Sequence, residues 1–183
     1  MQSFTLPLIL TLFGASAWAV REDVAAHRIP NRLTGSLLCA GLLLQFIFGG
    51  GNALGEGVLG ALVGFAVLLP LYLLRATGAG DVKFLAALGT LLGPYWTLIA
   101  GIYTLLAGGV LALSYLGFGA LRSSLSVAGA PLGLRIHIFH IRVRELRRER
   151  FPYALAIAVG ATAAVIQRGD LQPILTYLTG THP

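Results

Sequence analysis

The stretch FLAALGTLLGPYWTLIAGIYTLLAGGVLALSYLGFGAL, residues 84–121, decides the fold, because its 38 consecutive residues carry no charge. A helix crosses the hydrocarbon core of a bilayer in about 20 residues, so this run is too long for one span. Gly93-Pro94 divides it, since proline lacks an amide donor and disfavours helix at the residue before it. The stretch predicts two membrane-spanning helices, over residues 81–92 and 95–118, joined by a tight turn.

The rest of the chain is similarly apolar. Charge-free runs also cover residues 1–20, 33–55 and 57–74, and the 183-residue chain is 56% apolar and 11% charged, with a mean hydropathy of +0.82. A soluble domain carries about 25% charged residues, so a soluble enzyme and a disordered tail are excluded. The single cysteine, Cys39, excludes a disulfide scaffold. We expect an all-α integral membrane protein with one membrane-embedded domain over residues 1–183. Its six transmembrane helices are predicted at 3–20, 33–48, 54–74, 81–92, 95–118 and 152–167.

Basic residues occur in the first, third and fifth connecting segments and are absent from the second and fourth. They are Arg21, Arg28 and Arg32, then Arg75 and Lys83, then Arg122, Arg135, Arg142, Arg144, Arg147, Arg148 and Arg150, and only Arg168 falls outside this pattern. Positively charged loops stay in the cytoplasm, so we expect the odd-numbered segments on the cytoplasmic side and both termini on the other. Because the arginines follow topology, the sequence does not predict nucleic-acid binding.

The start of the chain has two interpretations. Ala17-Trp18-Ala19 has the small-x-small pattern of a signal peptidase site. Residues 1–4 lack a positive n-region, however, and the arginines that follow would resist translocation. An uncleaved first span is therefore the favoured interpretation.

Residues 119–151 are predicted to form a basic cytoplasmic loop. Within it, residues 134–150 space apolar side chains three or four apart among arginines, which is typical of an amphipathic helix on an anionic inner leaflet. His137 and His140 lie three apart there and are a possible metal pair, but no third ligand lies nearby in sequence. We therefore predict an interfacial helix, without a metal site or a cofactor.

Acidic residues near membrane spans are costly and are the first candidates for function. Glu145 and Glu149 lie among arginines, and Glu56 can reach water at the opposite interface, so none of them needs a catalytic role. Asp23 and Asp81, 58 residues apart, both lie at predicted cytoplasmic ends of spans.

Two such carboxylates can share a proton, so that one activates a water molecule as general base while the other acts as general acid. That pair can hydrolyse an amide without a metal or a nucleophilic side chain. Two alternatives stay open from placement alone. Each aspartate can be neutralised by a neighbouring arginine or lysine, or the pair can serve a non-enzymatic membrane subunit or a proton or cation transporter.

Both aspartates stand in distinctive local sequences. Asp81 belongs to Gly78-Ala79-Gly80-Asp81-Val82-Lys83, where glycines permit turns and close approach. Asp23 comes six residues before Ile29-Pro30-Asn31, a turn-prone tripeptide that is expected to start the second span.

With these motifs the sequence resembles the type IV prepilin peptidases, the GxGD-type aspartyl proteases of membranes. The matching pieces are D-x5-IPN over 23–31, GAGDVKFLAALG over 78–89 and FPYALAIAVG over 151–160. The resemblance covers roughly residues 5–166 and implies cleavage of a basic leader from pilin precursors at the cytoplasmic membrane face. It also implies that Asp23 and Asp81 are the catalytic pair. Gly78 and Gly80 would shape the loop of the second aspartate, and Lys83, Pro30 and Asn31 would support the motifs or the substrate.

The sequence departs from the larger, bifunctional members of that family. Those members have an extra cytoplasmic domain with paired CxxC motifs and also methylate the new pilin N-terminus, whereas the first loop here has only about 12 residues and the chain has one cysteine. Methylation is not expected. The short form resembles the peptidases of Flp or Tad-type pilus systems, which implies a Flp-like prepilin or a pseudopilin as partner in the bacterial inner membrane.

Overall fold

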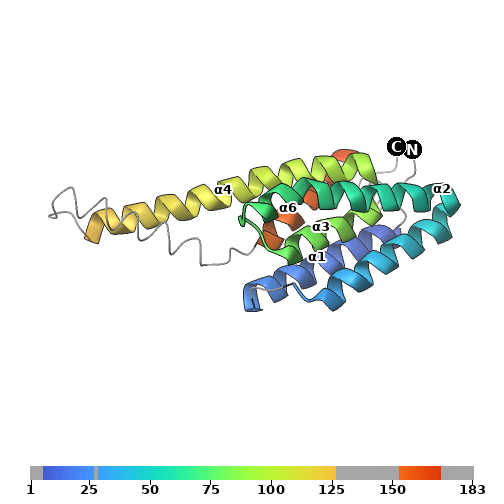
Figure 1. Cartoon of the computed structure of the whole chain (residues 1–183), viewed down its shortest axis with the longest axis horizontal. Coiled ribbons are helices and arrows are strands. Elements are labelled where there is room, and N and C mark those ends of the chain that lie inside the picture. The colour runs from blue at the N-terminus through green and yellow to red at the C-terminus, as the bar shows by residue number, and fades with distance from the viewer. Residues whose placement is uncertain (1–5, 27–28, 127–152, 170–183) are drawn as a thin grey trace, which may run out of the picture.

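Every regular element in the part of the chain that the structure describes is an α-helix (Figure 1). The structure is a computed structural model that describes residues 6–26, 29–126 and 153–169. Its helices are α1 (Leu6–Ala26), α2 (Asn31–Leu73), α3 (Ala79–Leu92), α4 (Pro94–Ser126) and α6 (Tyr153–Arg168). The predicted all-α class is confirmed for these residues. The predicted interfacial helix at 134–150, with His137 and His140, lies outside the described residues.

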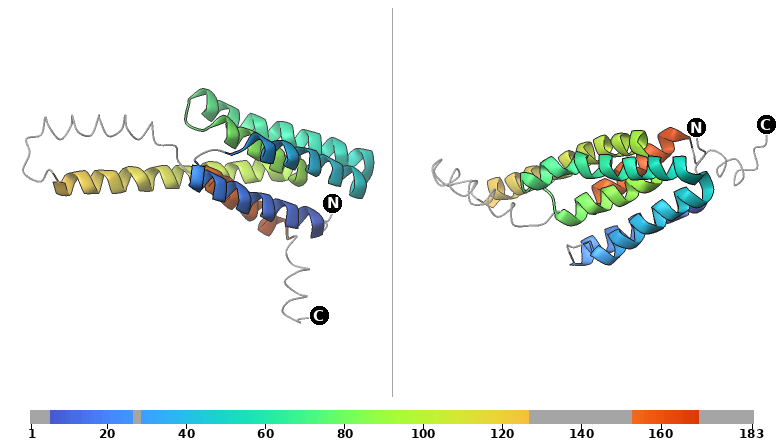
Figure 2. Two further views of the ribbon diagram at one scale, coloured as in Figure 1. Left: turned by 90° about the horizontal axis from the view of Figure 1, so that it is seen from below. Right: turned by 45° about the vertical axis from the view of Figure 1, so that its right-hand side comes forward.

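Helix α2 consists of two antiparallel arms (Figures 1 and 2). Gly50 interrupts it with φ 68° and ψ −160°, a conformation that glycine adopts without steric cost. The arms pack closely, since a Cβ added at Gly57 would lie 3.3 Å from side-chain atoms of Gln45 and Leu42. The turn implied between the predicted helices at 33–48 and 54–74 is confirmed. It is shorter than expected, because helical structure resumes directly after Gly50.

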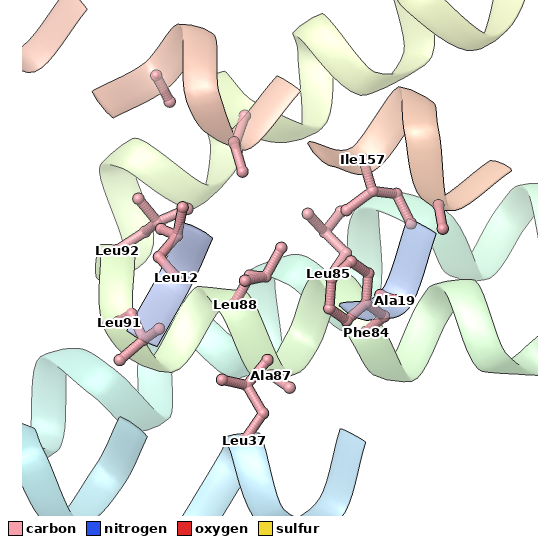
Figure 3. Close-up of a cluster of buried hydrophobic side chains, with 14 of the residues drawn as sticks. Leu12, Ala19, Leu37, Phe84, Leu85, Ala87, Leu88, Leu91, Leu92 and Ile157 are labelled. Atoms are coloured by element: carbon pink, nitrogen blue, oxygen red, sulfur yellow. The ribbon is translucent and has the colours of Figure 1, made fainter. Parts of the chain in front are cut away.

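The short helix α3 lies at the centre of the bundle, with 11 of its 14 residues buried. A helix that is apolar on all sides needs neighbours on all sides. Phe84 and Leu88 of α3 belong to one buried cluster with Leu12 of α1, Leu37 of α2 and Ile157 of α6 (Figure 3). Side chains of α1, α2 and α6 thus help to fix the position of α3.

Glycines let α2 approach the backbone of α3. A Cβ added at Gly60 would lie 2.1 Å from the carbonyl oxygen of Gly89, and one added at Gly64 would lie 2.6 Å from that of Leu85. Real Cβ atoms do not tolerate such distances, so these positions require glycine. The second arm of α2 is therefore a close-fitting support for α3.

The break predicted at Gly93-Pro94 is confirmed. Gly93 has φ 76°, α3 ends at Leu92 and α4 begins at Pro94. Helix ends leave carbonyl groups without intrahelical partners. The buried Gln45 side chain satisfies two of them, because its Nε2 donates to the carbonyl oxygens of Thr90 and Leu91 at 3.1 and 3.3 Å.

Arg168, the one basic residue outside the predicted charge pattern, serves the same end of α3. Its Nη1 donates to the carbonyl oxygen of Leu92 at 3.3 Å, and its guanidinium carbon lies 5.8 Å from the ring centroid of Trp96. A cation is favourable at a helix C-terminus and over an aromatic face. The contacts give Arg168 a structural reason to stand apart from the other arginines.

Two predicted helix ends were wrong. Helix α1 continues past residue 20 to Ala26, so Asp23 lies inside the helix and does not follow it, and α4 continues past residue 118 to Ser126. Loss of hydropathy marks where a chain can leave the membrane, but charged residues such as Arg21 and Glu22 do not end a helix. The bounds of α3 and α6 agree with prediction to within two residues.

Two of the described helices, Asn31–Leu73 and Pro94–Ser114 within α4, are long and apolar enough to cross a membrane by length and composition. Helices α3 and α6, with 14 and 16 residues, rise only about 21 and 24 Å. The hydrocarbon core is about 30 Å thick, so each of these two is shorter than a full crossing.

Candidate active site

Both predicted aspartates lie at the same end of the bundle. The C-terminal end of α1 and the N-terminal ends of α3 and α6 meet there, and α4 runs past them (Figures 1 and 2). Asp23 is in the last turns of α1 and Asp81 in the first turn of α3. Glu56 lies at the other end of the bundle, beside Gly93.

Asp23 is buried, with 5% of its surface exposed, and is fixed by a helix from the far end of the sequence. The backbone amide of Ala154, in the first turn of α6, donates to Asp23 Oδ2 at 3.0 Å. The positive end of a helix dipole and an amide donor both stabilise a carboxylate. This contact brings together residues 131 positions apart.

Asp81 is also buried, with 8% exposed. The amide of Gly78, which precedes α3, donates to Asp81 Oδ2 at 2.9 Å, so the aspartate caps its own helix. A Cβ at Gly78 would lie 3.3 Å from that same oxygen. Glycine at 78 therefore leaves room for the carboxylate.

The two motifs that the sequence placed far apart are in direct contact. A Cβ added at Gly80 would lie 3.3 Å from the Cβ of Ile29, and Lys83 Nζ donates to Asn31 Oδ1 at 3.0 Å. Pro30 begins α2 as predicted, and its carbonyl accepts from the amide of Leu33 at 3.0 Å. Lys83 thus ties the start of α3 to the start of α2, which gives it a position that the sequence alone did not supply.

Two residues at this end were not among the predicted site residues. Ala154 donates to Asp23, and the neighbouring Tyr153 is the first residue of α6, with its ring beside Gly108 of α4. The signal in the sequence was the stretch FPYALAIAVG, in which proline precedes an aromatic residue at the start of an apolar helix. That stretch contains no acidic residue, so the cost of acids near membrane spans does not single it out.

The geometry suits acid–base chemistry by a pair of carboxylates. Both side chains are withdrawn from bulk water and both accept amide hydrogen bonds at helix N-termini. Within residues 6–26, 29–126 and 153–169, no three His, Cys, Asp or Glu side chains are grouped so that they could hold a metal ion. Among the described residues, Asp23 and Asp81 are the two acidic side chains that are buried.

Comparison with known proteins gives consistent matches. A family model described as the type IV leader peptidase family matches residues 8–113, more than half of the chain, and includes both aspartates. The prepilin leader peptidase/N-methyltransferases of Aeromonas hydrophila and of Aeromonas salmonicida (strain A449) are each 39% identical to this chain over 118 residues. The match covers 61% of this chain and 39% of each relative, so it spans well under half of their length. No solved structure matches the chain significantly.

Proposed function

The chain belongs to the type IV leader peptidase family, and we propose that it is a membrane-embedded aspartyl endopeptidase that removes the basic leader from Flp-like prepilins. The observation that carries the proposal is that Asp23 and Asp81 are both buried and lie at the same end of the bundle. The contacts of Gly80 with Ile29 and of Lys83 with Asn31 support it, because they join the two motifs.

The pair would act without a covalent intermediate. One ionised aspartate takes a proton from a water molecule, whose oxygen attacks the scissile carbonyl carbon. The other aspartate, protonated, gives its proton to the carbonyl oxygen, and collapse of the tetrahedral intermediate expels the amine, which leaves with a proton from the dyad. Burial favours this division of roles, because two neighbouring carboxylates do not readily both ionise in a poorly solvated site.

We propose that six helical segments cross or enter the membrane, namely α1, the two arms of α2, α3, α4 and α6. Large apolar side chains point outward on several of these helices, with Leu10 62%, Ile47 62% and Leu113 70% exposed. Apolar surface of that extent suits contact with lipid. The short α3 enters only part of the bilayer, with the other segments around it. The distribution of arginines supports a cytoplasmic location of the aspartates, in the bacterial inner membrane.

The proposed substrate is a prepilin or pseudopilin, and the names of the relatives include a prepilin leader peptidase activity. Only residues 27–30 separate α1 from α2. This short connection supports the Flp or Tad-type assignment and a peptidase activity without methylation. A prepilin combines a basic leader with an apolar helix, so the helix would pack among the spans while the leader stays at the anionic inner leaflet.

The test is co-expression with candidate prepilins of the same genome, followed by mass spectrometry of the pilin. The parent should produce the shortened pilin, and Asp23→Asn and Asp81→Asn at equal membrane levels should not. Glu56→Gln is the matched control, since Glu56 is an acid at the other end of the bundle. Processing by either aspartate variant would refute the assignment. Unprocessed pilin together with proton or cation flux that both aspartate variants abolish would favour the transporter alternative.

A further inference from the structure

A third acidic residue, Glu22, lies directly beside Asp23 in the last turns of α1. Its side chain is half-buried, and its Oε1 accepts a hydrogen bond from Trp18 Nε1, one turn earlier in the helix, at 3.3 Å. A carboxylate can accept about four hydrogen bonds, and an indole is an uncharged donor. Trp18 therefore restricts the direction of Glu22 without neutralising its charge.

The charged side chains around Glu22 at this end of the bundle are mainly positive. In the described part of the chain they include Arg21 of α1, Arg32 at the start of α2, Arg75 just after α2 and Lys83 near the start of α3. These charges would repel a cationic peptide, and a pair of aspartates that shares a proton offers it only one negative charge. Of the acids that the structure describes at this end, Glu22 is the one that the proposed reaction does not use.

Glu22 is also within reach of a peptide held at Asp23. Successive side chains of a helix differ in direction by about 100°, so Glu22 flanks the buried Asp23 and does not point with it into the core. Adjacent Cα atoms are about 3.8 Å apart, and an extended peptide advances about 3.3 Å per residue. A substrate residue within about two or three positions of the scissile bond could therefore lie beside Glu22.

We propose that Glu22 is a specificity-determining residue, which binds a lysine or arginine side chain of the prepilin leader close to the cleavage site. The inference rests on the proposed peptidase function and gives the positive charge of the leader a partner on the enzyme, in addition to anionic lipid. A partly buried carboxylate attracts a cation more strongly than a fully exposed one, because it is less screened. The contact would set which bond of the leader lies across the two aspartates.

The test is Glu22→Gln, which keeps the shape of the side chain and an acceptor for Trp18 but removes the charge. The full-length enzyme is placed in liposomes of zwitterionic phosphatidylcholine with a purified prepilin, so that anionic lipid does not hold the leader. KM should rise about 3- to 10-fold while kcat changes less than twofold, because an interaction of the bound substrate is lost. Added salt should raise the parent's KM more than that of the variant.

Substitutions in the leader identify the partner of Glu22. Each lysine or arginine of the leader is replaced in turn by glutamine. At one position the parent's KM should rise by the same factor as in Glu22→Gln, and the two changes together should raise it no further, because the pair is already broken. Exchanging the charges, with Glu22→Lys in the enzyme and glutamate at that leader position, should restore cleavage that either change alone lowers.

Glu56→Gln is the matched control, since it removes the same charge at the other end of the bundle. It should keep the parent's KM for every leader. An unchanged KM in Glu22→Gln, or effects of Glu22→Gln that add to those of every leader substitution, would overturn the inference. Failure of the proposed function is distinguishable, because the parent itself would then leave the prepilin uncleaved.

Discussion

The contact between α2 and α3 makes a quantitative prediction, because α3 carries Asp81. In Gly60→Ala, the new Cβ would start 2.1 Å from the carbonyl oxygen of Gly89, whereas ordinary contact begins at 3.4 Å. The helices must therefore separate by about 1 Å at this point, or the packing around them must be strained. Overpacking of this kind costs about 1–3 kcal/mol.

The displacement should also lower the rate of catalysis. Asp81 is eight residues from Gly89 on the same rigid helix, about 12 Å along its axis, and a misplacement of about 1 Å can cost about 100-fold in rate. We expect Gly60→Ala to lower the thermal midpoint and to reduce cleavage of a purified prepilin about 10- to 100-fold per folded molecule.

The control for this substitution lies on the same arm of α2. A Cβ at Gly55 would meet no atom within 4 Å, so Gly55→Ala should keep full activity and gain up to about 1 kcal/mol from helix propensity. Thermal unfolding and cleavage are measured on both variants in the same detergent. A Gly60→Ala enzyme with the parent's midpoint and rate would refute the packing argument.

Two other substitutions separate stability from activity. Gln45→Leu should lower the free energy of unfolding by about 1–3 kcal/mol, because two buried carbonyl groups lose their hydrogen-bond donor. The folded fraction of this variant should cleave prepilin at the parent's rate. A loss of cleavage rate without a loss of stability would contradict this expectation. Lys83→Met should change the free energy of unfolding by less than about 0.5 kcal/mol, since Lys83 is exposed. It should nevertheless reduce the cleavage rate, because the hydrogen bond to Asn31 is lost. Adding Asn31→Ala to Lys83→Met should reduce the cleavage rate little further. Additive losses in the Lys83→Met/Asn31→Ala double variant would show that the two residues act separately.

Much of the fold was predictable because hydropathy and helix breakers act locally. The break at Gly93-Pro94 and the turn near Gly50 follow from backbone chemistry alone, and the structure confirms both. The end of α1 was not predictable from hydropathy, because Arg21 and Glu22 leave the apolar run without ending the helix. Sequence periodicity also does not reveal that Gly60 faces Gly89, since such contacts depend on how two helices cross.

Of the candidate site, the two acidic residues could be predicted from the sequence. Asp23 and Asp81 stand out because acids near spans are costly, and the charge distribution placed them on one side. Their immediate partners were not predictable, because one is the backbone amide of Ala154, which is the same in every non-proline residue.

The single-turnover rate of prepilin cleavage in liposomes by the purified parent, Asp23→Asn, Asp81→Asn and the double variant tests the central claim most directly. If the aspartates act as one unit, the cleavage rate of each single variant should be lower than the parent's by about 10³-fold or more. The rate of the double variant should be no lower than that of the single variants, because one aspartate alone cannot carry out the reaction. A parent that leaves the leader attached, or a single variant that keeps more than about a tenth of the parent's rate, would contradict the account.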